Sequence, residues 1–194
     1  MICAYDKVYL NMAQRVMGNM LNYAVYDCGY ELPEYYNMFL ESGYSERFGK
    51  GDVFVIAGMS GAELAIKVLD IPDDKIIMPG VYDGRSQEYW TGWILAYYQW
   101  YTGKSFRIIQ KEVPIERIRD MYNPYHEMDI SSAILKLREM SQVSRAETYL
   151  KKLRKRAGIS QSILAEETGI PVKTIQQYEP VSYTHLTLPT ILLV

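Results

Sequence analysis

Residues 161–179, QSILAEETGIPVKTIQQYE, constrain the fold more than any other part of the chain. Gly169 stands in the middle of the segment, where a turn between two helices commonly needs a positive φ that glycine accepts without a steric clash. Pro171 then sets φ for the start of a new helix. Ser160, just before the segment, has a hydroxyl that can accept a backbone N–H at a helix start. The pattern predicts two short helices joined by a tight turn.

Small and apolar residues recur where these two helices would meet. Leu164 and Ala165 lie on the expected inner face of the first helix, and the small Ala165 side chain would let the second helix cross closely. Ile170 would fill the turn, while Ile175 and Tyr178 are three residues apart and would form the buried stripe of the second helix. We therefore expect these five side chains to face inward.

A basic helix is expected immediately before this pair. Leu150, Leu153 and Ala157 have helical spacing, so one side of the helix would face a core. The other side would carry basic residues, namely Lys151, Lys152, Arg154, Lys155 and Arg156. A solvated amphipathic helix is the alternative for such a basic run on its own. The neighbouring two-helix pattern favours a surface built to meet a polyanion.

Residues 148–179 resemble the phage-repressor-like helix-turn-helix regulators, also called the xenobiotic response element (XRE) family. In that family the second helix of the motif enters the major groove of DNA, and residues at its exposed start read bases. The resemblance implies that Val172, Lys173 and Gln177 face base edges. Lys173 would donate to guanine and Gln177 would pair with adenine. Val172 departs from the polar residue often found there and offers only apolar contact, for example to a thymine methyl group.

The resemblance also implies phosphate contacts and partners. Gln161, Thr174 and Lys155 would contact phosphates and so fix the register of the protein on the duplex. Family members usually bind inverted half-sites as dimers, so double-stranded DNA and a second copy of the chain are the expected partners. The implied function is sequence-specific DNA binding that regulates transcription, for example as a repressor.

Charge is distributed unevenly along the chain, which has a net charge of −2. Residues 145–179 contain seven Lys or Arg and four Asp or Glu, whereas residues 1–144 contain fourteen and nineteen. Since phosphate contacts supply most non-specific DNA affinity, the basic segment suits DNA and the acidic body does not. Small regulators with this motif often act as antitoxins, whose added domain binds a toxin protein while the DNA end represses the shared operon. An antitoxin-like interaction protein is therefore the alternative function.

The motif domain is expected to be incomplete. The family's domain has about five helices, and three are expected here before the sequence changes character at Pro180. Residues 181–194, VSYTHLTLPTILLV, contain no Lys, Arg, Asp or Glu. VSYTHLTLPT looks like a translated sequencing-adapter fragment, so we interpret the tail as non-native and the gene as truncated near Glu179. A genuine hydrophobic tail is the alternative, although it falls short of the roughly 18 continuous apolar residues that suggest a membrane span.

Residues 1–143 are predicted to form an acidic, Tyr-rich helical domain, which makes the whole chain mainly α. The expected helices are 5–26, 32–40, 60–69, 86–102, 105–111, 114–122 and 129–140. Val53–Ile56 is either a strand or a short buried helix, residues 70–84 are rich in loops, and residues 141–147 are the best candidate linker. The aromatic helix 86–102 is expected to be central, and core packing is favoured over a ligand or partner groove.

Composition indicates a globular cytoplasmic protein, since 48% hydrophobic and 23% charged residues argue against disordered and membrane classes. Residues 1–20 lack the continuous apolar core of a secretory signal. Cys3 and Cys28 could pair, but a buried free thiol is favoured for Cys28.

Catalytic and cofactor motifs give only weak signals. The cluster YHEMD holds His126, Glu127 and Asp129 but lacks the second histidine that a zinc-protease helix requires. A surface or capping role is favoured for that cluster, and no phosphate-binding loop, dinucleotide motif or nucleophile elbow occurs. We expect no enzyme activity, no cofactor and no metal.

Overall fold

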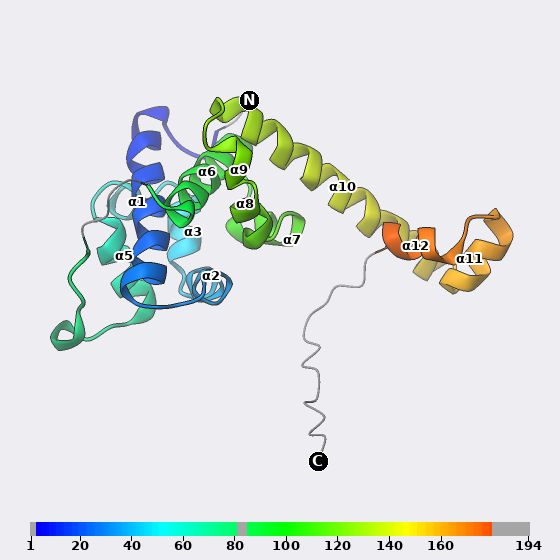
Figure 1. Ribbon diagram of the computed structural model, residues 1–194, viewed down its shortest axis with the longest axis horizontal. Helices are drawn as coiled ribbons and strands as arrows, with labels where there is room; N and C mark the ends of the chain where they lie inside the picture. The colour runs from blue at the N-terminus through cyan, green and yellow to red at the C-terminus, as the bar shows by residue number, and fades with distance from the viewer. Residues whose placement is uncertain (1–2, 81–84, 180–194) are drawn as a thin grey trace, which may run out of the picture. The chain divides into compact units, whose positions relative to one another are not determined.

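The computed structural model describes residues 3–80 and 85–179, and every regular element in those residues is helical (Figure 1). This confirms the mainly α fold class. The chain divides into two compact units, the first comprising residues 1–142 and the second beginning at Val143. The tail that was interpreted as non-native, residues 181–194, lies outside the described residues.

The first unit is a set of helices, most of which are joined by short turns, with a longer connection between residues 69 and 87 (Figure 1). The helices are α1 (Leu10–Asn22), α2 (Leu32–Glu41), α3 (Tyr44–Gly49), α4 (Val53–Ile56), α5 (Gly61–Leu69), α6 (Gln87–Thr102), α7 (Phe106–Glu112), α8 (Ile115–Asp120), α9 (Tyr122–Tyr125) and the first part of α10 (Ile130–Arg156). A 3-10 turn (Lys7–Tyr9) precedes α1, a π turn (Tyr23–Asp27) follows it, and a further 3-10 turn covers Asp73–Lys75.

Serine caps begin three of these helices. The Ser60 hydroxyl accepts the backbone N–H of Glu63 at 3.1 Å, and the Glu63 carboxylate accepts the Ser60 N–H at 2.6 Å. This reciprocal pair is the capping box of α5. Ser86 and Ser105 likewise accept a backbone N–H three residues on, at the starts of α6 and α7. The helices predicted at these positions are confirmed.

The segment Val53–Ile56 is a short helix, so the strand interpretation is wrong. The carboxylate of Asp52 accepts the Phe54 N–H at 3.0 Å and caps the first turn. Val55 and Ile56 are buried, while Val53 and Phe54 are exposed. One side of this helical turn therefore packs on the core. A run of only four apolar residues fits such a turn as well as a strand, so its length does not decide between them.

The boundary between the two units falls inside the linker expected at residues 141–147. This segment is helical, however, since α10 runs without a break from Ile130 to Arg156. The sequence SQVSRAE contains no glycine or proline that would end a helix. Polar residues of this kind are compatible with an exposed helix as well as with a linker.

Helices α1 and α6 approach each other through two glycines. A Cβ placed on Gly92 of α6 would lie 2.5 Å from the carbonyl oxygen of Met17, and one placed on Gly18 of α1 would lie 2.9 Å from that of Tyr89. Both distances are shorter than van der Waals contact allows. The absence of side chains at Gly18 and Gly92 therefore lets the two backbones touch.

Helix α5 meets α1 in the same way. A Cβ placed on Gly61, the first residue of α5, would lie 2.5 Å from the backbone nitrogen of Met20. Helix α1 thus lies against both α5 and α6, and Met17, Met20 and Leu21 are fully buried. The core of the first unit is built around α1.

The aromatic helix α6 is partly core and partly surface. Ile94, Leu95 and Tyr98 are buried, as a central helix requires. Trp90 and Trp93, by contrast, are only half-buried, and they lie at the edge of the core.

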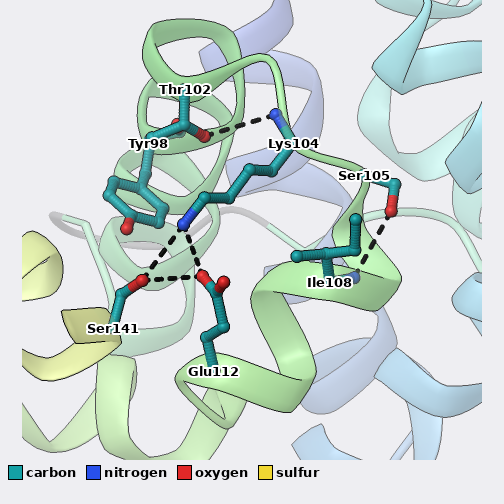
Figure 2. Close-up of polar contacts among 7 residues, drawn as sticks. All are labelled: Tyr98, Thr102, Lys104, Ser105, Ile108, Glu112 and Ser141. Atoms are coloured by element: carbon teal, nitrogen blue, oxygen red, sulfur yellow. Dashed lines mark hydrogen bonds and ion pairs between the residues drawn. The ribbon is translucent and has the colours of Figure 1, made fainter. Parts of the chain in front are cut away.

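A partly buried polar cluster connects the first part of α10 to the rest of this unit (Figure 2). The Lys104 ammonium group pairs with the Glu112 carboxylate and donates to the Ser141 hydroxyl at 3.0 Å. The Ser141 hydroxyl in turn donates to Glu112 Oε2 at 2.7 Å, and the Lys104 nitrogen lies 5.8 Å from the centre of the Tyr98 ring. These contacts join the end of α6, helix α7 and α10, and the charges compensate each other where little water reaches them.

The glycine contact makes a testable prediction. Replacing Gly92 with alanine (Gly92→Ala) should favour the isolated helix by about 1 kcal/mol, but the new methyl group meets backbone. We expect a net loss of about 1 to 3 kcal/mol in the free energy of unfolding, as overpacking gives. Urea unfolding followed by circular dichroism measures it.

Gly49→Ala is the matched control. A Cβ there would lie 3.5 Å from the nearest side-chain atom, in ordinary contact. This variant should be neutral or slightly more stable. Equal stability of the two variants would contradict the close approach of α1 and α6.

Candidate nucleic-acid interface

The second unit consists of the end of α10, α11 (Gln161–Thr168) and α12 (Val172–Tyr178). The Ser160 hydroxyl accepts the Ile163 N–H at 3.1 Å and caps α11, as predicted. Gly169 ends α11 with φ at 69°, the left-handed conformation that the sequence requires there. Pro171 immediately precedes α12. The two predicted helices and their turn are confirmed.

A bidentate ion pair holds the three helices of this unit together. Arg154 on α10 donates to both carboxylate oxygens of Glu179, with N–O distances of 2.7 to 2.9 Å, and its third nitrogen donates to the Ile159 carbonyl at 2.9 Å. The amide of Gln161 on α11 donates to the same carboxylate at 3.2 Å. Glu179 directly follows α12, so one carboxylate connects all three helices.

The electrostatics of the ion pair follow from its burial. Glu179 is 3% exposed, and the hydrogen bonds from Arg154 hold the pKa of its carboxyl group below the ordinary value. The same contact raises the pKa of the Arg154 guanidinium. Because a buried carboxylate needs a compensating charge, Arg154 is committed to this structural contact.

The sequence analysis did not predict this pair, since it placed Arg154 on the basic side of the helix, which was expected to meet a polyanion. The partners are 25 residues apart, and local periodicity contains no information about such pairs. An acidic residue at the end of an otherwise basic segment was the available signal.

The apolar side chains of this unit are buried less than predicted. Ile175 is buried, and Leu164 and Ala165 are half-buried, in agreement with their inward assignment. Tyr178, however, is 60% exposed and Ile170 is 44% exposed, so their predicted burial is wrong.

The inner face predicted for the basic helix is wrong as well. Leu150, Leu153 and Ala157 are all exposed. Three short helices offer too little surface to cover every apolar side chain. Within the described residues, no other element covers these side chains.

Comparison with known proteins agrees with this geometry. A helix-turn-helix family model matches residues 150–179. This segment is a helix-turn-helix. A search of curated proteins and a search of solved structures found no match to the chain.

The second helix of the helix-turn-helix presents two of the predicted base-reading residues to solvent. Lys173 and Gln177 are exposed on α12 and four residues apart, so they project from one side of the helix. Val172 begins α12 and is half-buried, which leaves part of its side chain for an apolar contact.

The three residues assigned to phosphates have different surroundings. Lys155 is exposed in the last turn of α10, and Thr174 is half-buried on α12. Gln161 uses one amide N–H for Glu179, so its second N–H and the free backbone N–H groups at the start of α11 remain as donors.

The other candidate groups of the sequence lie in the first unit. Cys3 and Cys28 are free thiols. His126 caps the end of α9, where its Nδ1 lies 2.9 Å from the carbonyl oxygen of Tyr122. Among residues 3–80 and 85–179, no three His, Cys, Asp or Glu side chains gather as metal ligands would. No helix in the same ranges is both long enough and apolar enough to cross a membrane.

The ion pair predicts how the helix-turn-helix responds to acid. Since the pKa of Glu179 is lowered from 4.5, the ionised carboxylate stabilises the fold above pH 4.5, and this stabilisation is lost as the pH falls through the lowered value. Glu179→Gln should therefore lower the urea midpoint of α12 at pH 7, and the difference from the parent chain should shrink at pH 3. NMR signals of α12 during urea titrations report it.

Glu167→Gln, on the exposed side of α11, is the control and should leave the midpoint unchanged at both values of pH. A loss at Glu179→Gln that is the same at pH 7 and pH 3 would show that the charge of Glu179 does not stabilise this unit.

Proposed function

We propose that this protein is an XRE-type transcriptional regulator that binds a specific DNA sequence and reads the major groove with α12. The observation that carries the proposal is the exposure of Lys173 and Gln177 on one side of the second helix of a helix-turn-helix. Lysine donates to the guanine O6 and N7 acceptors, and the glutamine amide matches the adenine N6 and N7 edge. These residue types suit base reading.

Phosphate binding is assigned to the basic side chains that the fold leaves free. Lys152, Lys155 and Arg156 are exposed near the end of α10, whereas Arg154 is neutralised by Glu179. The start of α11 adds backbone N–H groups with the positive end of the helix dipole. Together they supply the sequence-independent part of the affinity, which falls as salt concentration rises.

A homodimer is part of the proposal. One helix-turn-helix covers a single half-site, and two copies on inverted half-sites about 34 Å apart would double the readout. A two-fold symmetric target sequence follows from this arrangement.

Variants of Lys173 and Gln177 should lose affinity for the target sequence selectively. Lys173→Ala and Gln177→Ala should each lose about 1 to 3 kcal/mol on the target sequence but little on random DNA. Fluorescence anisotropy measures both, with the target selected from a pool of random duplexes by the parent chain.

Two controls separate base reading from general effects. Gln176→Ala changes an exposed neighbour on α12 that points to a different side, and it should bind as the parent does. Lys155→Ala should weaken target and random DNA equally and reduce the salt slope by about one. Equal losses on both DNAs for Lys173→Ala and Gln177→Ala would remove the base-reading assignment.

A second candidate function, binding of a partner protein as in antitoxins, is favoured by an exposed apolar segment of the first unit. Ile76, Ile77 and Met78 are all exposed, Met78 to 81%. The segment is fixed to the π turn, since the Tyr23 hydroxyl donates to the Ile77 carbonyl and Asp27 accepts the Gly80 N–H at 2.7 Å. A fixed apolar surface of this kind suits a protein partner.

Purification from the native host tests this second function. The chain should carry a partner protein in one-to-one ratio, and Met78→Asp should release it while Lys75→Asp, an exposed neighbour, should not. Recovery of the parent chain without a partner would contradict it.

A further inference from the structure

A cavity of about 220 Å³ opens on the first unit, between the start of α6, helix α9 and the start of α10. Its walls are mostly aromatic, and the side chains that matter here are Arg85, Trp90, Trp93, Tyr122, Tyr125 and His126. All of them belong to the first unit, so the cavity is independent of the helix-turn-helix and of the function proposed for it.

The rings of the wall support one another. The Trp90 and Tyr122 rings meet edge to face, with centroids 5.8 Å apart and planes at 84°. Tyr122 in turn stacks on His126, with centroids 4.2 Å apart and planes at 13°. These are the geometries that aromatic pairs prefer, so the wall is held in place without a ligand.

The wall rings keep part of their surface uncovered. Trp90, Trp93, Tyr122 and Tyr125 are all half-buried, whereas core rings of the same unit such as Tyr98 are fully buried. Uncovered ring faces around a hollow gain free energy when a flat apolar group replaces water there. The cavity is smaller than the roughly 300 to 1,000 Å³ of sites for drug-sized ligands, which favours one or two fused rings.

The charged groups at the cavity determine which ligand charge is favoured. The exposed Arg85 guanidinium lies 5.2 Å from the centre of the Tyr89 ring, and among the described residues no carboxylate pairs with it. The Glu127 carboxylate lies 3.6 Å from Nε2 of the wall residue His126, and the Glu127 side chain is 83% exposed to solvent. A guanidinium of this kind attracts a carboxylate and repels a cation.

We propose that this cavity binds a small planar aromatic molecule with an anionic group, its ring held against Trp90, Trp93 and Tyr122 and its anion by Arg85. The ring contacts supply affinity for any flat aromatic of this size, and Arg85 supplies the preference for a negative charge.

Three probes with the same ring and different charge test the proposal on the full chain. Indole-3-acetate is anionic, indole-3-ethanol is neutral and tryptamine is cationic. We expect calorimetric titration to rank their affinities in that order. Arg85→Gln should lower the affinity for indole-3-acetate about tenfold, as the loss of one charged hydrogen bond does, and leave indole-3-ethanol unchanged.

Two further changes keep the test independent of folding defects. Met128 lines the cavity and is exposed, so Met128→Glu should weaken indole-3-acetate binding and Met128→Lys should strengthen it. Arg107→Gln removes an exposed arginine that does not line this cavity and should have no effect. Equal affinity for the three probes, no measurable binding of any of them, or unchanged indole-3-acetate binding by Arg85→Gln would overturn the proposal.

Discussion

The bidentate pair between Arg154 and Glu179 is the interaction on which the helix-turn-helix depends. The unit buries Ile175 but leaves several other large apolar side chains exposed, so apolar burial alone does not fix α12. One carboxylate accepts from α10 and from α11 and lies at the end of α12, which sets the position of all three helices. A bidentate guanidinium contact also defines orientation, because its two bonds must be satisfied together. The exposed side chains of α12 are thereby held in a fixed position for a duplex.

The first unit is stabilised mainly by its apolar core rather than by an ion pair. Its core contains many fully buried aromatic and aliphatic side chains, and α1 and α6 touch through Gly18 and Gly92. A close backbone contact between helices maximises dispersion and excludes water, so this unit needs few buried charges. The partly buried cluster of Lys104, Glu112 and Ser141 does contain charges, and it connects α10 to the end of α6 and to α7. The acidic body and the basic helix-turn-helix thus differ in stabilisation as well as in charge.

Local signals in the sequence predicted the helices. Contacts between residues far apart in the chain could not be predicted in this way. Caps at Ser60, Ser86 and Ser160 and the left-handed Gly169 are encoded within four residues, so each helix start or end followed from the sequence. The exposure of Lys173 and Gln177 on α12 was implied by the resemblance to helix-turn-helix regulators. Val53–Ile56 was ambiguous because four apolar residues fit a strand or a helical turn. Exposure of Ile170 and Tyr178 and the Arg154–Glu179 pair depend on which helices meet, which periodicity does not specify.

The proposed function requires that this chain bind specific DNA through its helix-turn-helix. Hydrogen–deuterium exchange of the full chain, with and without its selected duplex, tests it most directly. We expect slower exchange in α11, in α12 and in residues 143–156 when DNA is bound, with residues 3–80 unchanged. Slower exchange confined to residues 3–80, or no change anywhere at saturating DNA, would contradict it.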